Sequence, residues 1–167
     1  MSIKVYFDLD GTLYNLYGIE NWLETIETEQ KGIFNSYGLN LVERIKDLEE
    51  LDEVIKQLSI YGVEFNVITW LPMGASVEYE EICAKEKKEW VRKYLPFINE
   101  IVCQPYGTPK QKGISKRASK MILIDDNKEV CNMWATNKQR ISIQVDRNFS
   151  AVEALWTILD SIENGLI

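Results

Sequence analysis

The stretch Val5-Tyr6-Phe7-Asp8-Leu9-Asp10-Gly11-Thr12 decides how the rest of the chain can be interpreted. It completes an apolar run from Ile3 that is typical of a buried strand, and then places two acids one residue apart. Alternate side chains of a strand point to the same face, so Asp8 and Asp10 are predicted to lie together. Carboxylates that close repel each other in apolar surroundings, which indicates a nearby cation or a shared proton. Gly11 allows the backbone to turn sharply after them.

The plain alternative is a strand followed by an ordinary turn, because Asp and Gly are common turn residues. That alternative leaves Asp8 unexplained. Two later apolar runs also end in polar residues: the run 63–69 ends at Thr69, and the run 121–124 is followed by Asp125 and Asp126. The carboxyl ends of parallel strands lie at one edge of a sheet, so we expect these side chains to converge there.

Apolar runs and segments of helical spacing alternate along the chain, which is typical of a parallel sheet covered by helices. Strands are predicted at 3–7, 63–69, 98–103, 121–124 and 141–145. Helices are predicted from about 19 to Gly32, from 41 to Gly62, from Ser76 to about Tyr94, after Asn127 and from Ser150. The Glu/Lys-rich face of the helix from Ser76 is expected to be solvated. The 167 residues suit one domain, 1–167, in which 14–43 form a small helical cap.

Composition excludes several classes of function. There is no histidine, which removes Ser-His-Asp and Cys-His hydrolases and HExxH zinc enzymes. The net charge of −7 weighs against broad nucleic-acid binding. Three cysteines without CxxC spacing favour reduced, buried thiols. No apolar run approaches membrane-spanning length and no signal peptide is visible, so we expect a soluble, cytoplasmic protein without a membrane partner.

Carboxylates that meet at one sheet edge favour a hard cation bound by oxygen atoms, and Mg²⁺ fits best. The candidate ligands are Asp8, Asp10, Asp125 and Asp126. A metal site beside a lysine and a hydroxyl is what phosphoryl transfer needs, because these groups neutralise and hold the phosphoryl oxygens. Without histidine, a carboxylate can act as the nucleophile through an aspartyl-phosphate.

Four motifs, in this order, resemble those of the haloacid dehalogenase superfamily of aspartate-nucleophile phosphohydrolases. They are Asp8 to Thr12, Val67 to Thr69, a lysine upstream of the fourth strand, and Leu123 to Asp126. The resemblance implies an α/β fold, a three-layer Rossmannoid sandwich whose five parallel strands are ordered 5-4-1-2-3 with a minimal helical cap. The chain also looks like small phage and bacterial relatives of the 5′-nucleotidases in that superfamily.

The resemblance also implies a role for each motif residue. Asp8 would be the nucleophile and a magnesium ligand. Asp10 would protonate the leaving group and then deprotonate water, while its backbone carbonyl binds the metal. Thr69 would bind the transferred phosphoryl group. Asp126 is the first choice for direct metal ligand, with Asp125 assisting or bound through water.

The motif lysine is open between three residues. Lys110 is favoured because it follows a rigid Thr-Pro turn, and Lys112 and Lys116 are the alternatives. With Arg117 and Lys120 they form a basic run that is either a solvated loop or a rim attracting phosphates. The residues expected to contact the phosphate are Gly11, Thr12, Trp70 and Lys112.

The expected substrate is a small phosphomonoester, with a nucleoside monophosphate favoured. The small cap and the basic run keep a polynucleotide 3′-phosphatase, acting on a nucleic-acid end, as an alternative. A binding or regulatory protein of the same fold without turnover is a second alternative. Tyr14, Tyr17 and Trp22 could stack on a base or sugar, although core packing is the expected role of aromatics at this spacing. Nothing in the sequence determines the oligomeric state.

Overall fold

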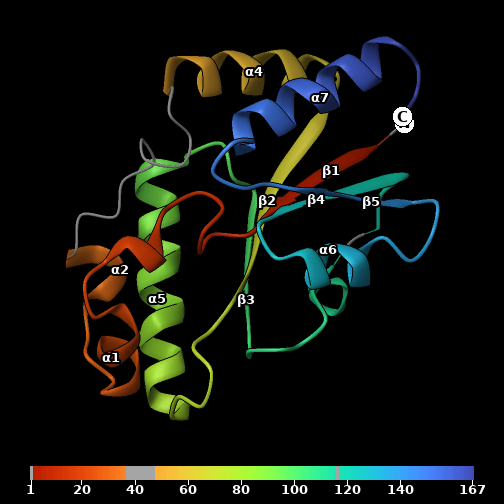
Figure 1. Cartoon of the computed structure of the whole chain (residues 1–167). Helices are drawn as coiled ribbons and strands as arrows, with labels where there is room; N and C mark the ends of the chain where they lie inside the picture. The colour runs from red at the N-terminus through yellow and green to blue at the C-terminus, as the bar shows by residue number, and fades with distance from the viewer. Residues whose placement is uncertain (1, 37–47, 116) are drawn as a thin grey trace.

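The computed structural model describes residues 2–36, 48–115 and 117–167. Within them lies one five-stranded parallel sheet, in the order β3-β2-β1-β4-β5 (Figure 1). This is the predicted order 5-4-1-2-3 reversed, so the α/β class and the strand order are confirmed. The strands are β1 (Ile3–Phe7), β2 (Val63–Trp70), β3 (Glu100–Gln104), β4 (Lys120–Asp125) and β5 (Arg140–Gln144).

Helices cover both faces of the sheet and make three layers. The helices are η1 (Leu16–Gly18), α1 (Trp22–Glu27), α2 (Ile33–Ser36), α4 (Leu48–Ile60), α5 (Val77–Tyr94), η2 (Lys110–Gly113), α6 (Lys128–Trp134) and α7 (Ala151–Glu163). In Figure 1, α4 and α7 lie together above the sheet and α6 lies below it. Val5 and Phe7 of β1 belong to the core with α4, α5 and α7, whereas Tyr6 packs with Trp134 of α6. A strand buried on both faces is apolar along most of its length, and in β1 only Lys4 is charged.

The capping predictions are confirmed at two helices. Ser76 precedes α5, and its hydroxyl accepts a hydrogen bond from the backbone of Tyr79. Ser150 and Glu153 form the predicted capping box at the start of α7, each side chain accepting from the other's backbone N–H. These bonds satisfy N–H groups that the first turn of a helix leaves unpaired.

The predicted helix from 19 to Gly32 is wrong in detail. Within this range the chain forms only α1, while η1 precedes the range and α2 follows it. Left-handed residues bound α1: Asn21 has φ 57°, Glu29 φ 53° and Gly32 φ 89°. Such backbone cannot continue a right-handed helix. Residues 37–43 of the predicted cap, and 41–47 of the second predicted helix, lie outside the described residues.

In the described ranges no helix combines the length and the apolar character needed to cross a bilayer.

Candidate active site

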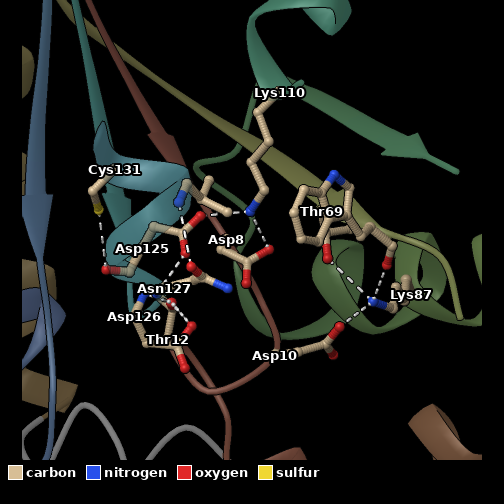
Figure 2. Close-up of polar contacts among 12 residues, drawn as sticks. Asp8, Asp10, Thr12, Thr69, Lys87, Lys110, Asp125, Asp126, Asn127 and Cys131 are labelled. Carbon is tan, nitrogen blue, oxygen red and sulfur yellow. Dashed lines mark hydrogen bonds and ion pairs between the residues drawn. The ribbon is translucent and has the colours of Figure 1, made fainter. Parts of the chain in front are cut away.

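Three carboxylates meet at the carboxyl edge of the sheet. One oxygen from each of Asp8, Asp125 and Asp126 lies within 4.8 Å of the others (Figure 2). The pairing of β1 with β4 brings these residues together, because Phe7 lies opposite Ile124 and the acids follow directly after them. The backbone N–H of Asp8 then donates to the carbonyl of Ile124 over 3.0 Å, which places Asp8 level with Asp125. The two strand-end motifs are therefore parts of one site.

Gly11 and Thr12 hold Asp126 against this cluster. The Thr12 hydroxyl accepts from the backbone N–H of Asp126 over 3.1 Å and donates to its carboxylate over 3.5 Å. Gly11 has φ 79°, and a Cβ there would lie 2.3 Å from the Asp126 carboxylate. A larger residue would push Asp126 away. The turn therefore requires glycine at this position for two reasons, its positive φ and its lack of a side chain. The Thr12 side chain thus contacts an acid of the cluster, and the contact of Gly11 and Thr12 with phosphate stays a prediction.

Crowding perturbs the acids of the cluster. Burial, followed by the charge of Asp8, raises the pKa of Asp125 to about 6. Burial, followed by the charges of Asp8 and Asp125, raises the pKa of Asp126 to about 7. Both shifts disfavour the ionised carboxylates, so a cation that neutralises them would be bound strongly. The donors are all oxygen atoms, and the Gly11 turn brings one of them inward, so the site fits Mg²⁺.

Lys110 of η2 supplies a cation to the same cluster. Its ammonium group lies 2.7 Å from Asp8 and 2.6 Å from Asp125, and the side chain is buried. Burial alone would lower the pKa of Lys110, but the attraction of the two carboxylates outweighs it and raises the pKa. An ammonium group has three protons, so two ion pairs leave one for a phosphoryl oxygen.

Trp70 fixes the turn that carries Lys110. Its indole N–H donates to the carbonyl of Thr108 over 2.8 Å, and the Lys110 ammonium lies 5.6 Å from its ring centroid. Trp70 therefore positions the lysine, whereas its predicted contact with phosphate stays a prediction.

The other basic residues are arranged differently from the predicted rim. Lys112 is exposed and is not among the described residues that line the cavity at the site. Lys116 lies outside the described residues. Lys120 begins β4, at the end of the strand opposite Asp125, so it and Lys110 lie at opposite edges of the sheet. The described residues of this run therefore do not form one continuous rim beside the acids.

Thr69 lies at the same edge, on the neighbouring strand β2, and is fully buried. Its hydroxyl accepts a hydrogen bond from Lys87 over 3.1 Å. Lys87 is 1% exposed and belongs to α5, so the prediction that the charged face of this helix is solvated is wrong at this residue. The available signal was spacing: Lys87 continues the buried stripe Tyr79, Cys83 at intervals of four residues.

Asp10 points away from the carboxylate cluster toward α5 (Figure 2). One of its oxygens accepts from Lys87 over 2.6 Å, and the other from the Tyr14 hydroxyl over 2.7 Å. Burial, followed by the charge of Asp10, raises the pKa of Tyr14 well above its ordinary value, so the phenol stays a donor. The Tyr14 ring packs edge-on against Trp90 at 4.8 Å, which is the expected core role.

Segment 29–34 is fastened to α5 beside the site. Glu86, a second buried charge on the supposedly solvated face, accepts from the backbone N–H groups of Gly32 over 2.6 Å and Phe34 over 3.3 Å. The Tyr79 hydroxyl donates to the carbonyl of Gln30 over 2.8 Å. The Phe34 ring lies 4.8 Å from the Lys87 ammonium. These contacts place the segment as a wall of the site.

A cavity of about 300 Å³ opens beside the acids. Asp8, Asp10 and Lys110 line its polar end. Asp125, Asp126, Asn127, Lys87 and Glu27 add further polar groups to the lining. The other lining residues are apolar or aromatic and include Tyr17, Trp22, Leu23, Trp70 and Tyr106. Tyr17 contacts Trp22 edge-on at 5.2 Å, and Trp70 contacts Tyr106 at 4.9 Å. The cavity is thus suited to a ligand with one anionic end and one flat or apolar end.

Metal-free protein is expected to lose stability as pH rises from 4 to 7. The pKa of Asp126 is raised from 3.8 to about 7 in the folded state, so folding favours its protonated form. That contribution is complete below the unfolded value and is lost as pH rises through the folded value. Thermal melts in chelator should show Tm falling over this range.

Two variants serve as controls for the slope of Tm against pH. The slope should be shallower in Asp126→Asn, where, of the two acids with raised pKa values, only Asp125 still titrates, and it should be unchanged in Asp160→Asn, an exposed acid on α7. Equal slopes in wild type and Asp126→Asn would contradict the prediction.

Comparison with known proteins does not assign the chain to a family. No protein-family model and no curated protein matches the chain. Among solved structures, a chain from "Structure of Pnkp1/Rnl/Hen1 complex" is similar, with a TM-score of 0.49 and 19% sequence identity. The similarity covers 86% of this chain and 46% of that one, so this chain spans less than half of its length.

Proposed function

We propose that this protein is a Mg²⁺-dependent phosphomonoesterase that works through an aspartyl-phosphate on Asp8. The observation that carries the proposal is the cluster of Asp8, Asp125 and Asp126 with Lys110 at the mouth of a cavity. Membership of the haloacid dehalogenase superfamily, suggested by the four motifs, is part of the same proposal.

In the first step an oxygen of Asp8 attacks phosphorus, and the bond from phosphorus to the ester oxygen breaks. Asp10, which accepts hydrogen bonds at both oxygens in the structure, must first take up a proton for this step, and it then gives that proton to the departing alkoxide. In the second step Asp10 takes a proton from water, and the hydroxide oxygen attacks the phosphorus of the aspartyl-phosphate. The bond to Asp8 breaks, which releases phosphate and restores both acids.

Three groups of the chain stabilise the charge that moves in these steps. The third proton of Lys110 is available to a phosphoryl oxygen, next to the nucleophile that the lysine holds. Thr69 is buried at the same edge and is not among the described residues that line the cavity, and in this proposal its hydroxyl would donate to a second oxygen of a phosphoryl group bound at Asp8. Mg²⁺, held by Asp8 and Asp126 with Asp125 assisting, would neutralise phosphoryl charge when bound.

The proposed substrate is a nucleoside monophosphate or a phosphomonoester of similar shape. The polar end of the cavity suits the phosphate, and the wall that includes Tyr17 and Trp22 suits a base or another flat group. The volume of about 300 Å³ lies at the lower end of the range for small-molecule sites, which favours a small ester over a polynucleotide end.

Turnover is expected to require a divalent cation. Without it, the repulsion among the three carboxylates opposes entry of a dianionic substrate, and we expect chelator to lower the rate about 10³-fold or more. Phosphate release should be measured on an aryl phosphate, on nucleoside monophosphates and on a 3′-phosphorylated oligonucleotide, with Mg²⁺ or with chelator. The expected ranking places a mononucleotide first.

Other rankings have definite meanings. A preference for the oligonucleotide would replace the proposed substrate by a nucleic-acid end and leave the reaction intact. No release from any ester, by protein that melts cooperatively, would overturn the enzyme proposal in favour of a binding protein.

A further inference from the structure

The Lys87 ammonium group donates all three of its protons to acceptors within the protein. An ammonium group has three protons. Those of Lys87 go to Asp10 over 2.6 Å, to the Thr69 hydroxyl over 3.1 Å and to the Trp70 carbonyl over 2.7 Å. Lys110, by contrast, has one proton left over from its two ion pairs. Lys87 is therefore saturated by fixed partners, although it lines the same cavity.

The hydrogen bond from Lys87 sets the direction of the Thr69 hydroxyl. A lysine can only donate, so the Thr69 oxygen is the acceptor in this pair. The proton of that hydroxyl must then point to a different acceptor. This is the orientation that a group binding a phosphoryl oxygen requires.

Lys87 and Tyr14 together hold both oxygens of Asp10. Lys87 donates to one and Tyr14 donates to the other. Both donors are fully buried and anchored, Lys87 on α5 and Tyr14 against Trp90, so neither can follow a carboxylate that rotates. The position of Asp10 is thus fixed from two sides.

Packing alone does not explain a lysine at this position. The buried stripe of α5 would be continued by Met or Leu, and burial of an ammonium group is costly unless its partners compensate. The partners of Lys87 are Asp10 and Thr69, two residues to which the proposed reaction assigns a chemical role. Buried charges that contact reacting groups are common at functional sites.

We propose that Lys87 and Tyr14 are positioning residues, which fix Asp10 for proton transfer to the leaving group and, through Lys87, aim the Thr69 hydroxyl at the phosphoryl group. This inference rests on the proposed function. It assigns neither residue a contact with substrate. Its consequence is that loss of either residue harms esters whose leaving group needs a proton more than esters whose leaving group does not.

The test compares an aryl phosphate, which releases a stable phenolate, with an alkyl phosphate, whose alkoxide must be protonated. The measured quantity is kcat/KM, because it reports formation of the aspartyl-phosphate and excludes the shared second step. For Lys87→Met we expect the alkyl phosphate to lose about 100-fold more than the aryl phosphate, the size of effect that misplacing a catalytic group produces. For Tyr14→Phe, which keeps the ring, we expect about a 10-fold selective loss.

Two controls separate positioning from structure. Lys88→Met changes the next lysine of α5, which is exposed. It should leave kcat/KM for the aryl phosphate and kcat/KM for the alkyl phosphate at their wild-type values. In the Asp10→Asn background, Lys87→Met should add no selective loss, because no proton donor is left to position. A further selective loss there would overturn the proposal.

The remaining outcomes are equally decisive. Equal losses on both esters, or no loss, would overturn the positioning of Asp10 by these residues and leave the proposed function standing. If Lys87→Met does not melt cooperatively, Tyr14→Phe decides on the same criterion. If the wild-type protein hydrolyses neither ester with Mg²⁺, the proposed function and this inference both fail.

Discussion

Replacing Asp8 by Asn is expected to abolish turnover, with kcat falling at least about 10⁴-fold. The amide oxygen of Asn is a poor nucleophile, and the variant has no carboxylate at this position to carry the phosphoryl group. Lys110 keeps its partner Asp125, so the substitution should leave η2 in place. Phosphate release and trapping of labelled phosphoenzyme, both in Mg²⁺, are the measurements. Neither a rate nor a label above background is expected.

The thermal stability of Asp8→Asn should not fall. The substitution removes one of the two ion pairs of Lys110, but it also relieves the repulsion by which Asp8 raises the pKa values of Asp125 and Asp126. An inactive variant with an unchanged or higher Tm separates loss of chemistry from loss of fold. Asp160→Asn is the matched control, since it makes the same change at an exposed site on α7. Activity of Asp8→Asn within 10-fold of wild type would rule out Asp8 as the nucleophile.

Asp10→Asn is expected to slow turnover about 10²- to 10⁴-fold and to accumulate phosphoenzyme. The variant lacks the acid that protonates the leaving group and the base that deprotonates water. An aryl phosphate needs no protonation of its leaving group, so the first step survives with this substrate while the second step is blocked. The variant keeps Asp8, so the phosphoryl group remains bound to the protein.

The mass of the intact protein after mixing with an aryl phosphate tests this directly. We expect a phosphorylated species that persists in Asp10→Asn and is absent in Asp8→Asn. The two variants therefore fail at different steps, which distinguishes nucleophile from proton carrier. Wild-type rates in Asp10→Asn would show that this residue has another role.

Local patterns predicted the sheet and the carboxylate cluster. The strand that precedes Asp8 is apolar except at Lys4, because both of its faces are buried, one by α4, α5 and α7 and the other by α6. Parallel pairing of β1 with β4 then brings Asp125 and Asp126 beside Asp8. These features depend on neighbours in the chain and on one general rule of sheet topology, so they can be inferred before any coordinates.

The surroundings of Asp10 could not be inferred in this way. Lys87 lies far along the chain, on a helix with many charged residues, and charge on a helix ordinarily indicates solvent. Its spacing from Tyr79 and Cys83 was a signal of its burial, but its partners depend on how α5 packs against the end of β2 and against segment 29–34. The Glu86 contacts were hidden for the same reason.

The amino-acid sequence by itself determined the parallel sheet, the strand ends that carry Asp8, Thr69 and Asp125, and the oxygen-only character of the acidic site. Periodicity and residue type are local properties, and they are sufficient for these features. Only the tertiary structure decided which lysine contacts Asp8 and which holds Asp10. Three-dimensional proximity selects Lys110 for the first and Lys87 for the second, because the energy of an ion pair depends on distance and burial and not on separation along the chain.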